Sequence, residues 1–342
     1  MAVTQTAISY YGFQSAKQSA PDFKEMVEHG CTTVILAVTE FDFDFRRCVI
    51  PEVVDEAHRQ GLRVLIDPWG IGKFFGGEQV SLFLQNNVNH RQVSALTGEA
   101  LPAACFTSQA FRDYFNHMCL TIARDCDADG FFWDEPHYRL PMHTSSFLQL
   151  SEDWSCRCPE CMKKFEAYYG YEMPRFMNDD VAEFRRKEAL FTLADCSRQL
   201  KELKPELEIT CCIHATLHDY YNIGYRGYDD WDLIGACPYF DVFSTTIIGW
   251  DQPKKFFVDI TERTIKMAKK YNKISERWIQ GYYKEPEDFA KVDEVAQLYS
   301  DMGADRLAAW TFRGGVNTMV AAPHAIELWD RIGENYKRLL KK

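Results

Sequence analysis

The sequence lacks the long apolar segments and the excess of positive charge that would indicate a membrane or nucleic-acid partner. Its 342 residues include no apolar stretch of about 18 residues, the minimum for a membrane-spanning helix. Lys and Arg number 39 against 50 Asp and Glu, and the net charge of −11 does not suit a phosphate backbone. The first residues, MAVTQTAISYYGF, contain neither a basic nor a long apolar segment, so no signal peptide is expected. We therefore expect a cytoplasmic protein with no membrane and no nucleic-acid partner.

Sequence signatures of the common nucleotide-binding folds are also missing. No G-x-G-x-x-G follows any early apolar run, so a dinucleotide-binding fold loses its main support. The glycine-rich segment DPWGIGKFFGGE, at 67–78, lacks G-x-x-x-x-G-K-[ST] and is no phosphate-binding loop. We therefore expect no organic cofactor.

What the chain does contain is an alternation of short β-rich runs with helical patterns. The β-rich runs are 7–13, 31–40, 62–70, 129–135, 207–216, 241–250, 277–283 and 305–312. The helical patterns are 20–30, 50–61, 111–130, 181–204, 256–272, 287–303 and 323–340. Because each helical crossover returns the chain to the same end of the sheet, the strands should pair in parallel. Eight such strands predict an α/β fold, a (β/α)8 TIM barrel that forms one catalytic domain over residues 1–342.

Polar and aromatic residues gather at the C-terminal ends of the predicted strands. In an α/β barrel these ends converge on one mouth, where active sites are built. We therefore expect these residues to bind substrate: Tyr11, Glu40, Asp67, Trp69, His137, His214, Trp250, Gln280, Tyr282, Trp310 and Arg313. Aromatic residues make up 14% of the chain, and sugar-binding clefts use aromatic rings as stacking platforms.

The fourth predicted strand ends in an unusual pair of carboxylates. In GFFWDEPHY, at 130–138, three aromatic residues lead directly into Asp134 and Glu135. Adjacent side chains on a regular strand point to opposite faces, so both reach the mouth only if the strand ends or bulges there. Such a pair at a strand end is a candidate for acid/base chemistry.

Three of the 12 cysteines are closely spaced. Cys156, Cys158 and Cys161 form C-x-C-x-x-C, which in a chain without an export signal is typical of metal ligands. Zinc requires four ligands, and Cys105, in the long loop after the third predicted strand, is the candidate for the fourth. Four thiolates leave no open position, so the zinc would be structural. We predict a cysteine-rich insertion after the fourth strand, at 138–180, that carries this zinc.

Three segments of the chain resemble the β-galactosidases of glycoside hydrolase family 42. CFTSQAFRDYF, FFWDEPHY and CRCPECMKKFEAYYG occur in the same order and at similar spacing, over about residues 105–170. The resemblance implies a (β/α)8 catalytic domain and a general acid/base role for Glu135. It implies these zinc ligands: Cys105, Cys156, Cys158 and Cys161.

Two positions depart from the family pattern. Asp134 stands where the family and its wider clan of retaining (β/α)8 glycosidases have Asn. Gln280 stands where the clan has a nucleophilic Glu at the end of the seventh strand. The chain therefore resembles a distant relative rather than a β-galactosidase of family 42 itself.

The expected activity is hydrolysis of a short oligosaccharide or glycoside, with Glu135 as the general acid/base. This reaction needs a proton for the leaving oxygen and stabilisation of an oxocarbenium-like transition state. The second carboxylate stays open: Glu285, Asp251 or Glu40 could act as a nucleophile with retention, or activate water with inversion. In a third mechanism, an N-acetyl group of the substrate attacks and Asp134 steers it, as the resemblance of the Asp-Glu pair to family 20 hexosaminidases suggests.

Two other functions remain open at this stage. One is a carbohydrate-binding barrel that has lost its catalytic nucleophile on the seventh strand. The other is a metal-dependent barrel hydrolase or isomerase, with His137, His214, Asp67 and Glu135 as ligands. The paired H-x-H on the first strand that is typical of such amidohydrolases is absent from AISYYGF. A homo-oligomer is compatible with the sequence in each case.

Overall fold

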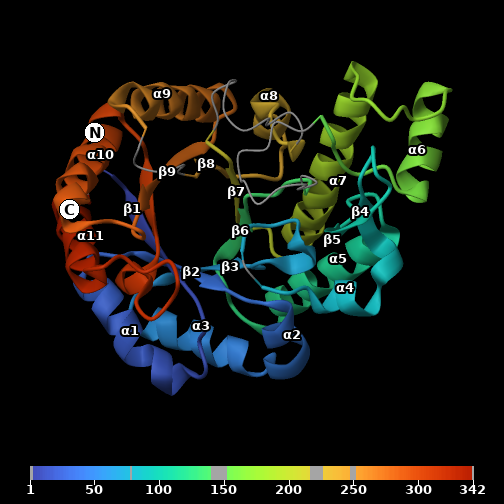
Figure 1. Ribbon diagram of the computed structural model, residues 1–342. Coiled ribbons are helices and arrows are strands. Elements are labelled where there is room, and N and C mark those ends of the chain that lie inside the picture. The colour runs from blue at the N-terminus through green and yellow to red at the C-terminus, as the bar shows by residue number, and fades with distance from the viewer. Residues whose placement is uncertain (1–2, 78, 140–151, 216–225, 247–251, 341–342) are drawn as a thin grey trace.

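A closed barrel of eight parallel strands forms the centre of the molecule (Figure 1). The computed structural model describes residues 3–77, 79–139, 152–215, 226–246 and 252–340. The strands follow the order β1-β10-β9-β8-β7-β6-β3-β2 around the ring. They are β1 Gln5–Tyr10, β2 Thr33–Ala37, β3 Arg63–Asp67, β6 Gly130–Asp134, β7 Glu208–Ile213, β8 Val242–Thr245, β9 Ile274–Gln280 and β10 Arg306–Trp310. Each predicted β-rich run overlaps one of these strands, so the predicted (β/α)8 barrel is confirmed.

Helices surround the barrel on its outer side, as Figure 1 shows. They are α1 Ala16–Glu28, α2 Glu40–Arg46, α3 Val49–Arg59, α4 Leu82–Asn86, α5 Gln109–Asp125, α6 Pro159–Tyr169, α7 Asp179–Leu203, α8 Trp231–Gly235, α9 Lys254–Lys270, α10 Phe289–Met302 and α11 Ala325–Leu339. Several begin at a side-chain cap, such as Ser108 of α5 and Asn178 of α7, each of which accepts a hydrogen bond from a backbone N–H of the first turn. No helix in the described ranges has the length and apolar character needed to cross a membrane.

The interior of the barrel is arranged in layers. One buried apolar layer consists of Ala7, Ile35, Leu65, Phe132, Cys212, Trp278 and Ala308. Because side chains alternate along a strand, the residue two positions further on also faces inward, at the C-terminal rim. These rim residues are Ser9, Ala37, Asp67, Asp134, His214, Gln280 and Trp310, of which all but Ala37 and Trp310 are polar. The apolar layer therefore forms the floor of a polar mouth.

A two-stranded antiparallel hairpin stands outside the barrel, between β3 and α5. It consists of β4 Arg91–Val93 and β5 Ala100–Ala104, in a segment that the sequence predicted as a long loop. A bridge between Ser94 and Ser155 joins this hairpin to the segment before α6. The hairpin thereby brings together the two cysteine-bearing parts of the chain.

Candidate active site

The end of β6 delivers both carboxylates of the Asp-Glu pair to the mouth. Asp134 follows the inward-facing Phe132 by two positions, so its side chain faces inward as well. Glu135 leaves the strand with φ of +44°, a left-handed conformation that non-glycine residues rarely adopt. This turn places its Oε2 3.6 Å from Nδ1 of His214, which directly follows β7. Backbone strain of this kind costs about 1–3 kcal/mol and is concentrated at functional sites.

Two histidines and an arginine hold Glu135 in place. Nδ1 of His137 lies 2.6 Å from the backbone oxygen of Glu135, and the rings of His137 and His214 meet edge to face. Nη1 of Arg226 lies 3.3 Å from Nε2 of His214. Burial, together with the charge of Arg226, holds the pKa of His214 well below its usual value, so the ring is neutral. Because a guanidinium only donates, Nε2 accepts and the ring proton sits on Nδ1, on the side of Glu135.

A further carboxyl group lies at the rim, at the end of β3. Asp67 follows Leu65 of the apolar layer by two positions, just as Asp134 follows Phe132 on the neighbouring strand β6. Burial, reinforced by the charge of Asp134, raises the pKa of Asp67 well above its usual value. Burial, reinforced by the charge of Glu135, does the same to the pKa of Asp134. This pair of carboxyl groups therefore retains a proton at pH values where an exposed aspartate has lost it.

The loop after β3 packs directly on Asp134. The backbone N–H of Gly76 donates to the backbone oxygen of Asp134 at 2.8 Å, and a Cβ on Gly76 would lie 2.4 Å from Oδ2 of that residue. Glu40 anchors this loop, since its carboxylate accepts hydrogen bonds from the N–H of Gly72, the hydroxyl of Ser81 and the N–H of Phe83, each at 2.7 Å. Glu40 is thus engaged in supporting the loop.

Four aromatic rings form a continuous wall around one side of the mouth. Trp69 contacts Tyr11 with ring centroids 4.7 Å apart, Tyr11 contacts Trp310 at 5.8 Å, and Trp310 contacts Tyr282 at 4.7 Å. These rings come from the ends of β3, β1, β10 and β9. Gln280 lies beside this wall and donates from Nε2 to the backbone oxygen of Tyr282 at 2.9 Å. Such a wall can stack against the apolar face of a sugar ring.

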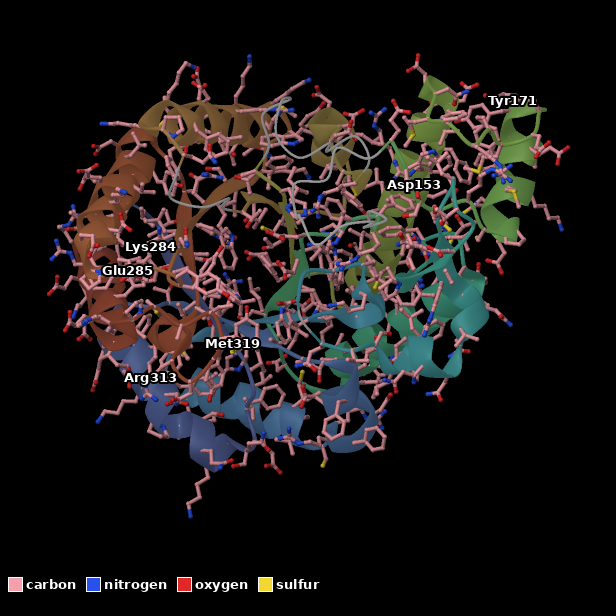
Figure 2. The ribbon with its side chains drawn as sticks, in the orientation of Figure 1. Asp153, Tyr171, Lys284, Glu285, Arg313 and Met319 are labelled. Atoms are coloured by element: carbon pink, nitrogen blue, oxygen red, sulfur yellow. The ribbon has the colours of Figure 1, made fainter. Side chains whose placement is uncertain are left out.

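Other residues predicted at the mouth have different surroundings. Nη1 of Arg313 lies 3.1 Å from Oδ1 of Asp22, and the same guanidinium pairs with Glu25, so it is tied to α1. Glu285 is exposed and directly precedes the short helix η4 Pro286–Asp288, beyond β9, without a side-chain hydrogen bond to that helix. Figure 2 labels both Arg313 and Glu285. The remaining predicted positions, Trp250 and Asp251, lie outside the described residues.

The four predicted zinc ligands come together at the side of the barrel. The sulfur atoms of Cys105, Cys156, Cys158 and Cys161 all lie within 4.8 Å of one another, and all four residues are buried. Cys105 follows β5, whereas Cys158 caps the first turn of α6. Hydrogen bonds from the thiols of Cys105, Cys156 and Cys161 hold the pKa of Cys158 below its usual value.

The geometry of this cluster fits a zinc ion. Four sulfurs at ~2.3 Å from a tetrahedral zinc lie about 3.8 Å apart. The sulfur of Cys105 lies 3.7 Å from that of Cys158 and 3.4 Å from that of Cys161. The backbone N–H of Val93 donates to the sulfur of Cys156 at 3.3 Å, a contact that also orients thiolate ligands.

No family model and no curated protein matches the chain. Solved structures do match it. The catalytic domain of β-amylase from Paenibacillus polymyxa gives a TM-score of 0.71 at 9% identity, covering 99% of this chain and 100% of that one. Endo-1,4-β-mannanase from Rhizomucor miehei gives 0.65 at 14% identity, covering 99% and 96%. β-Galactosidase from the haloarchaeon Halorubrum lacusprofundi gives 0.71 at 11% identity, covering 98% of this chain but 58% of that one.

These neighbours are glycoside hydrolases with (β/α)8 barrels. At such low identities the likeness establishes the fold of the chain. It does not single out family 42.

Sequence reasoning missed Arg226, which contacts His214 at the mouth. It lies in the loop after β7, outside every predicted strand and helix, and follows the strand end by more than ten positions. A lone arginine in a loop gives no signal of its own, because its contact with His214 depends on the path of the loop.

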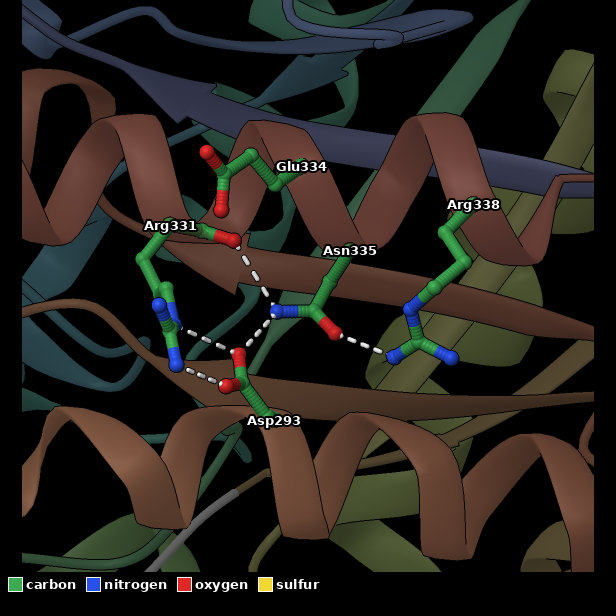
Figure 3. Close-up of a pocket in the computed structure, with 5 residues that line it drawn as sticks. All are labelled: Asp293, Arg331, Glu334, Asn335 and Arg338. Atoms are coloured by element: carbon green, nitrogen blue, oxygen red, sulfur yellow. Dashed lines mark hydrogen bonds and ion pairs between the residues drawn. The ribbon is translucent and has the colours of Figure 1, made fainter.

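A cavity of about 370 Å³ lies on the outside of the barrel, between α10 and α11 (Figure 3). Four of its five lining residues bind one another: Arg331 pairs with Asp293, and Asn335 donates to Asp293 at 2.6 Å. Nη2 of Arg338 donates to Oδ1 of Asn335 at 2.5 Å. Since these groups satisfy each other, we assign this cavity no function.

Proposed function

We propose that the chain is a glycoside hydrolase in which Glu135 is the general acid/base. The observation that carries this proposal is the left-handed turn at Glu135, which sets its carboxylate 3.6 Å from His214 at the mouth of the barrel. Active sites of this fold lie at that mouth. The aromatic wall beside it suits a carbohydrate substrate. Glycosidases among the solved structures that share the fold also support a carbohydrate substrate.

In the proposed reaction, Glu135 donates its proton to the glycosidic oxygen as the bond to the anomeric carbon breaks. The proton on Nδ1 of His214 faces Oε2 of Glu135, which leaves Oε1 to carry the proton that is transferred. Once the leaving group departs, the carboxylate of Glu135 takes a proton from the attacking water.

Asp134 is the favoured second carboxylate. It faces inward beside Glu135, whereas Glu40 is engaged by three hydrogen bonds and Glu285 is exposed beyond β9. In its ionised form Asp134 stabilises the oxocarbenium-like transition state, and it can steer either a water or an N-acetyl group of the substrate. Burial and the charge of Asp134 raise the pKa of Asp67, so the Asp67 carboxyl group favours its protonated form while Asp134 is charged.

We also propose that a structural zinc binds the four clustered cysteines: Cys105, Cys156, Cys158 and Cys161. The ion would link the β4–β5 hairpin to the start of α6 and take no part in the reaction. In the described part of the chain, these four residues are also the one set of three or more ligand atoms gathered tightly enough for a metal. This argues against the metal-dependent hydrolase with ligands His137, His214, Asp67 and Glu135.

The proposal is tested by comparing Glu135→Gln with Glu285→Gln on a panel of 4-nitrophenyl glycosides. We expect Glu135→Gln to lower kcat/KM by about 10²–10⁴-fold, and more on a substrate with a poor leaving group such as a disaccharide. The exposed Glu285 should tolerate the same change. An unaltered rate in Glu135→Gln, or an equal loss in Glu285→Gln, would refute the assignment. Sugar binding without hydrolysis by the wild type would instead favour a carbohydrate-binding barrel.

A further inference from the structure

Two buried hydrogen-bond acceptors face the mouth with no partner among the described residues: Oδ1 of Asp67 and Oε1 of Gln280. Their side chains are only 2% and 4% exposed. Asp67 follows the inward-facing Leu65 by two positions, and Gln280 follows the inward-facing Trp278 in the same way. Both side chains therefore face the barrel interior, above the apolar floor.

These two acceptors lie on opposite sides of the barrel. In the strand order around the ring, β3 and β9 are separated by the same number of strands in both directions. The strands β6, which is followed by Glu135, and β10, which ends at Trp310, are opposite one another in the same sense. Across the mouth, the acceptor of Asp67 thus lies opposite that of Gln280. The carboxyl groups at the end of β6 lie opposite the ring of Trp310.

An unpartnered buried acceptor lowers the stability of the free protein, and few are kept without a use. Here the missing partners are donors, and they must come from above the floor. Three carboxyl groups at the same mouth, on Asp67, Asp134 and Glu135, disfavour a ligand with negative charge.

We propose that Asp67 and Gln280 form the innermost sugar subsite, where each accepts a hydrogen bond from a different hydroxyl group of one neutral sugar unit. This subsite rests on the proposed function, because it places the anomeric carbon of that sugar between Glu135 and Trp310. Sugars that carry a carboxylate or a phosphate are excluded by the three carboxyl groups. A sugar that lacks one of the two hydroxyls leaves an acceptor unpaired again and binds poorly.

The test uses the 4-nitrophenyl glycoside that the wild type hydrolyses best, or binds best, together with its complete set of monodeoxy analogues. Binding is measured by calorimetry in the Glu135→Gln background, where turnover does not interfere. We expect two of the monodeoxy compounds to bind at least about tenfold more weakly than the parent. Gln280→Leu should abolish the penalty for one of them and Asp67→Ala the penalty for the other.

Thr210→Val is the matched control. The hydroxyl of Thr210 is also buried and unpartnered among the described residues, but it lies on β7 two positions before Cys212 of the apolar layer, below the floor. Removing it should leave the binding of every sugar unchanged. The derivative of the parent glycoside that carries a carboxylate at position 6 should bind at least about a hundredfold more weakly, because the mouth is acidic.

The outcomes separate this subsite from the hydrolytic function. If the wild type hydrolyses the glycoside, but neither Gln280→Leu nor Asp67→Ala removes the loss of affinity of a monodeoxy analogue, the subsite is wrong. The proposed hydrolytic reaction then stands. If the two substitutions remove the losses of affinity as expected, but the wild type hydrolyses no glycoside, the hydrolytic reaction is wrong. The subsite then stands. Binding of no sugar at all would overturn both.

Discussion

At Glu135 the backbone adopts a φ of +44°, and that single dihedral angle separates two adjacent carboxyl groups. Asp134, still on the strand, faces Asp67 and the floor of the mouth, whereas Glu135 turns toward His214. Their surroundings differ accordingly: Asp134 is buried among other carboxyl groups, and Glu135 meets a neutral ring. Different environments for two carboxyl groups are what acid/base catalysis requires.

The carboxyl pair of Asp67 and Asp134 predicts a particular dependence of stability on pH. Both have raised pKa values in the folded state. Below about pH 3.9 the folded and unfolded states both hold the Asp67 proton. As pH rises, the unfolded chain loses that proton first, so the native state is destabilised by about 1.4 kcal/mol per pH unit until the folded group titrates. Asp67→Asn should escape this loss, and its advantage over wild type should grow from pH 4 to pH 7 in urea unfolding.

A double-mutant cycle with Asp134→Asn tests whether the two groups act on each other. Either substitution alone relieves the mutual repulsion, so the double variant should gain less than the sum of the single gains. Strict additivity, or an advantage that does not change with pH, would show that no proton is shared.

Arg313 provides a contrasting residue, since it was predicted to bind substrate but is held by Asp22 and Glu25. Its guanidinium is about one-third exposed, so the ion pairs are partly screened by solvent. We expect Arg313→Met to lower the free energy of unfolding by about 1 kcal/mol and to leave kcat/KM within about twofold of wild type. If Arg313→Met instead raised KM strongly and left the free energy of unfolding unchanged, Arg313 would be a substrate-binding residue.

At the scale of elements, the loop after β3 and the β4–β5 hairpin are both held by side-chain contacts with parts of the chain that are distant in sequence. Glu40, at the start of α2, anchors the loop that covers Asp134. The cysteine cluster anchors the hairpin to α6 in a similar way. In both cases the supporting residues stand outside the barrel ring, and their effect is to fix a connecting segment.

The zinc proposal predicts a loss confined to these peripheral elements. Purified protein should contain about one zinc per chain by elemental analysis, and Cys105→Ser should lower that content and the melting temperature together. The barrel does not include the cluster, so far-ultraviolet circular dichroism should keep most of its signal.

Cys237→Ala serves as the control for the zinc experiment, because Cys237 is buried but lies outside the cluster. It should keep the full zinc content. Wild-type protein that contains no zinc, and whose melting temperature does not respond to a chelator, would contradict the proposal.

Local sequence patterns predicted the strands of the barrel but not the ties between elements. The runs that correspond to the eight strands of the ring are apolar and bounded by turns, which are local signals. The hairpin was missed because RQV and ALPAA are short and the second contains proline. The engagement of Glu40 and Arg313 depends on partners 32 or more positions away, which no local pattern reveals.

At the scale of the whole molecule, the apolar layer divides the barrel interior into a mouth and a lower charged layer. In the lower layer Arg306 of β10 donates to both carboxylate oxygens of Glu208 of β7, at 2.6 and 2.8 Å. These strands are not neighbours in the ring, so the pair spans the interior. Arg63 of β3 adds a third charge, 3.5 Å from Glu208. The mouth holds the candidate catalytic residues, whereas the ion pairs of this lower layer stabilise the barrel.

Breaking the cross-barrel pair should therefore destabilise the molecule without altering the mouth. Arg306→Met leaves a largely buried Glu208 with one weaker partner, which should cost about 3 kcal/mol in the free energy of unfolding at pH 7. The apolar floor separates this site from Glu135, so kcat should stay near the wild-type value in protein that remains folded.

The surface pair of Arg331 and Asp293 is the matched comparison, because it joins the same kinds of group at 42% and 33% exposure (Figure 3). Arg331→Met should cost less than about 1 kcal/mol, since solvent screens an exposed pair.

Burial raises the pKa of Glu208, but the hydrogen bonds and charge of Arg306 outweigh it and hold that pKa below its usual value. The stabilisation is therefore present above about pH 4.3 and is lost as pH falls further. The difference between wild type and Arg306→Met should shrink in acid, and a difference that persists there would mean that Arg306 stabilises the barrel by packing and not by its charge.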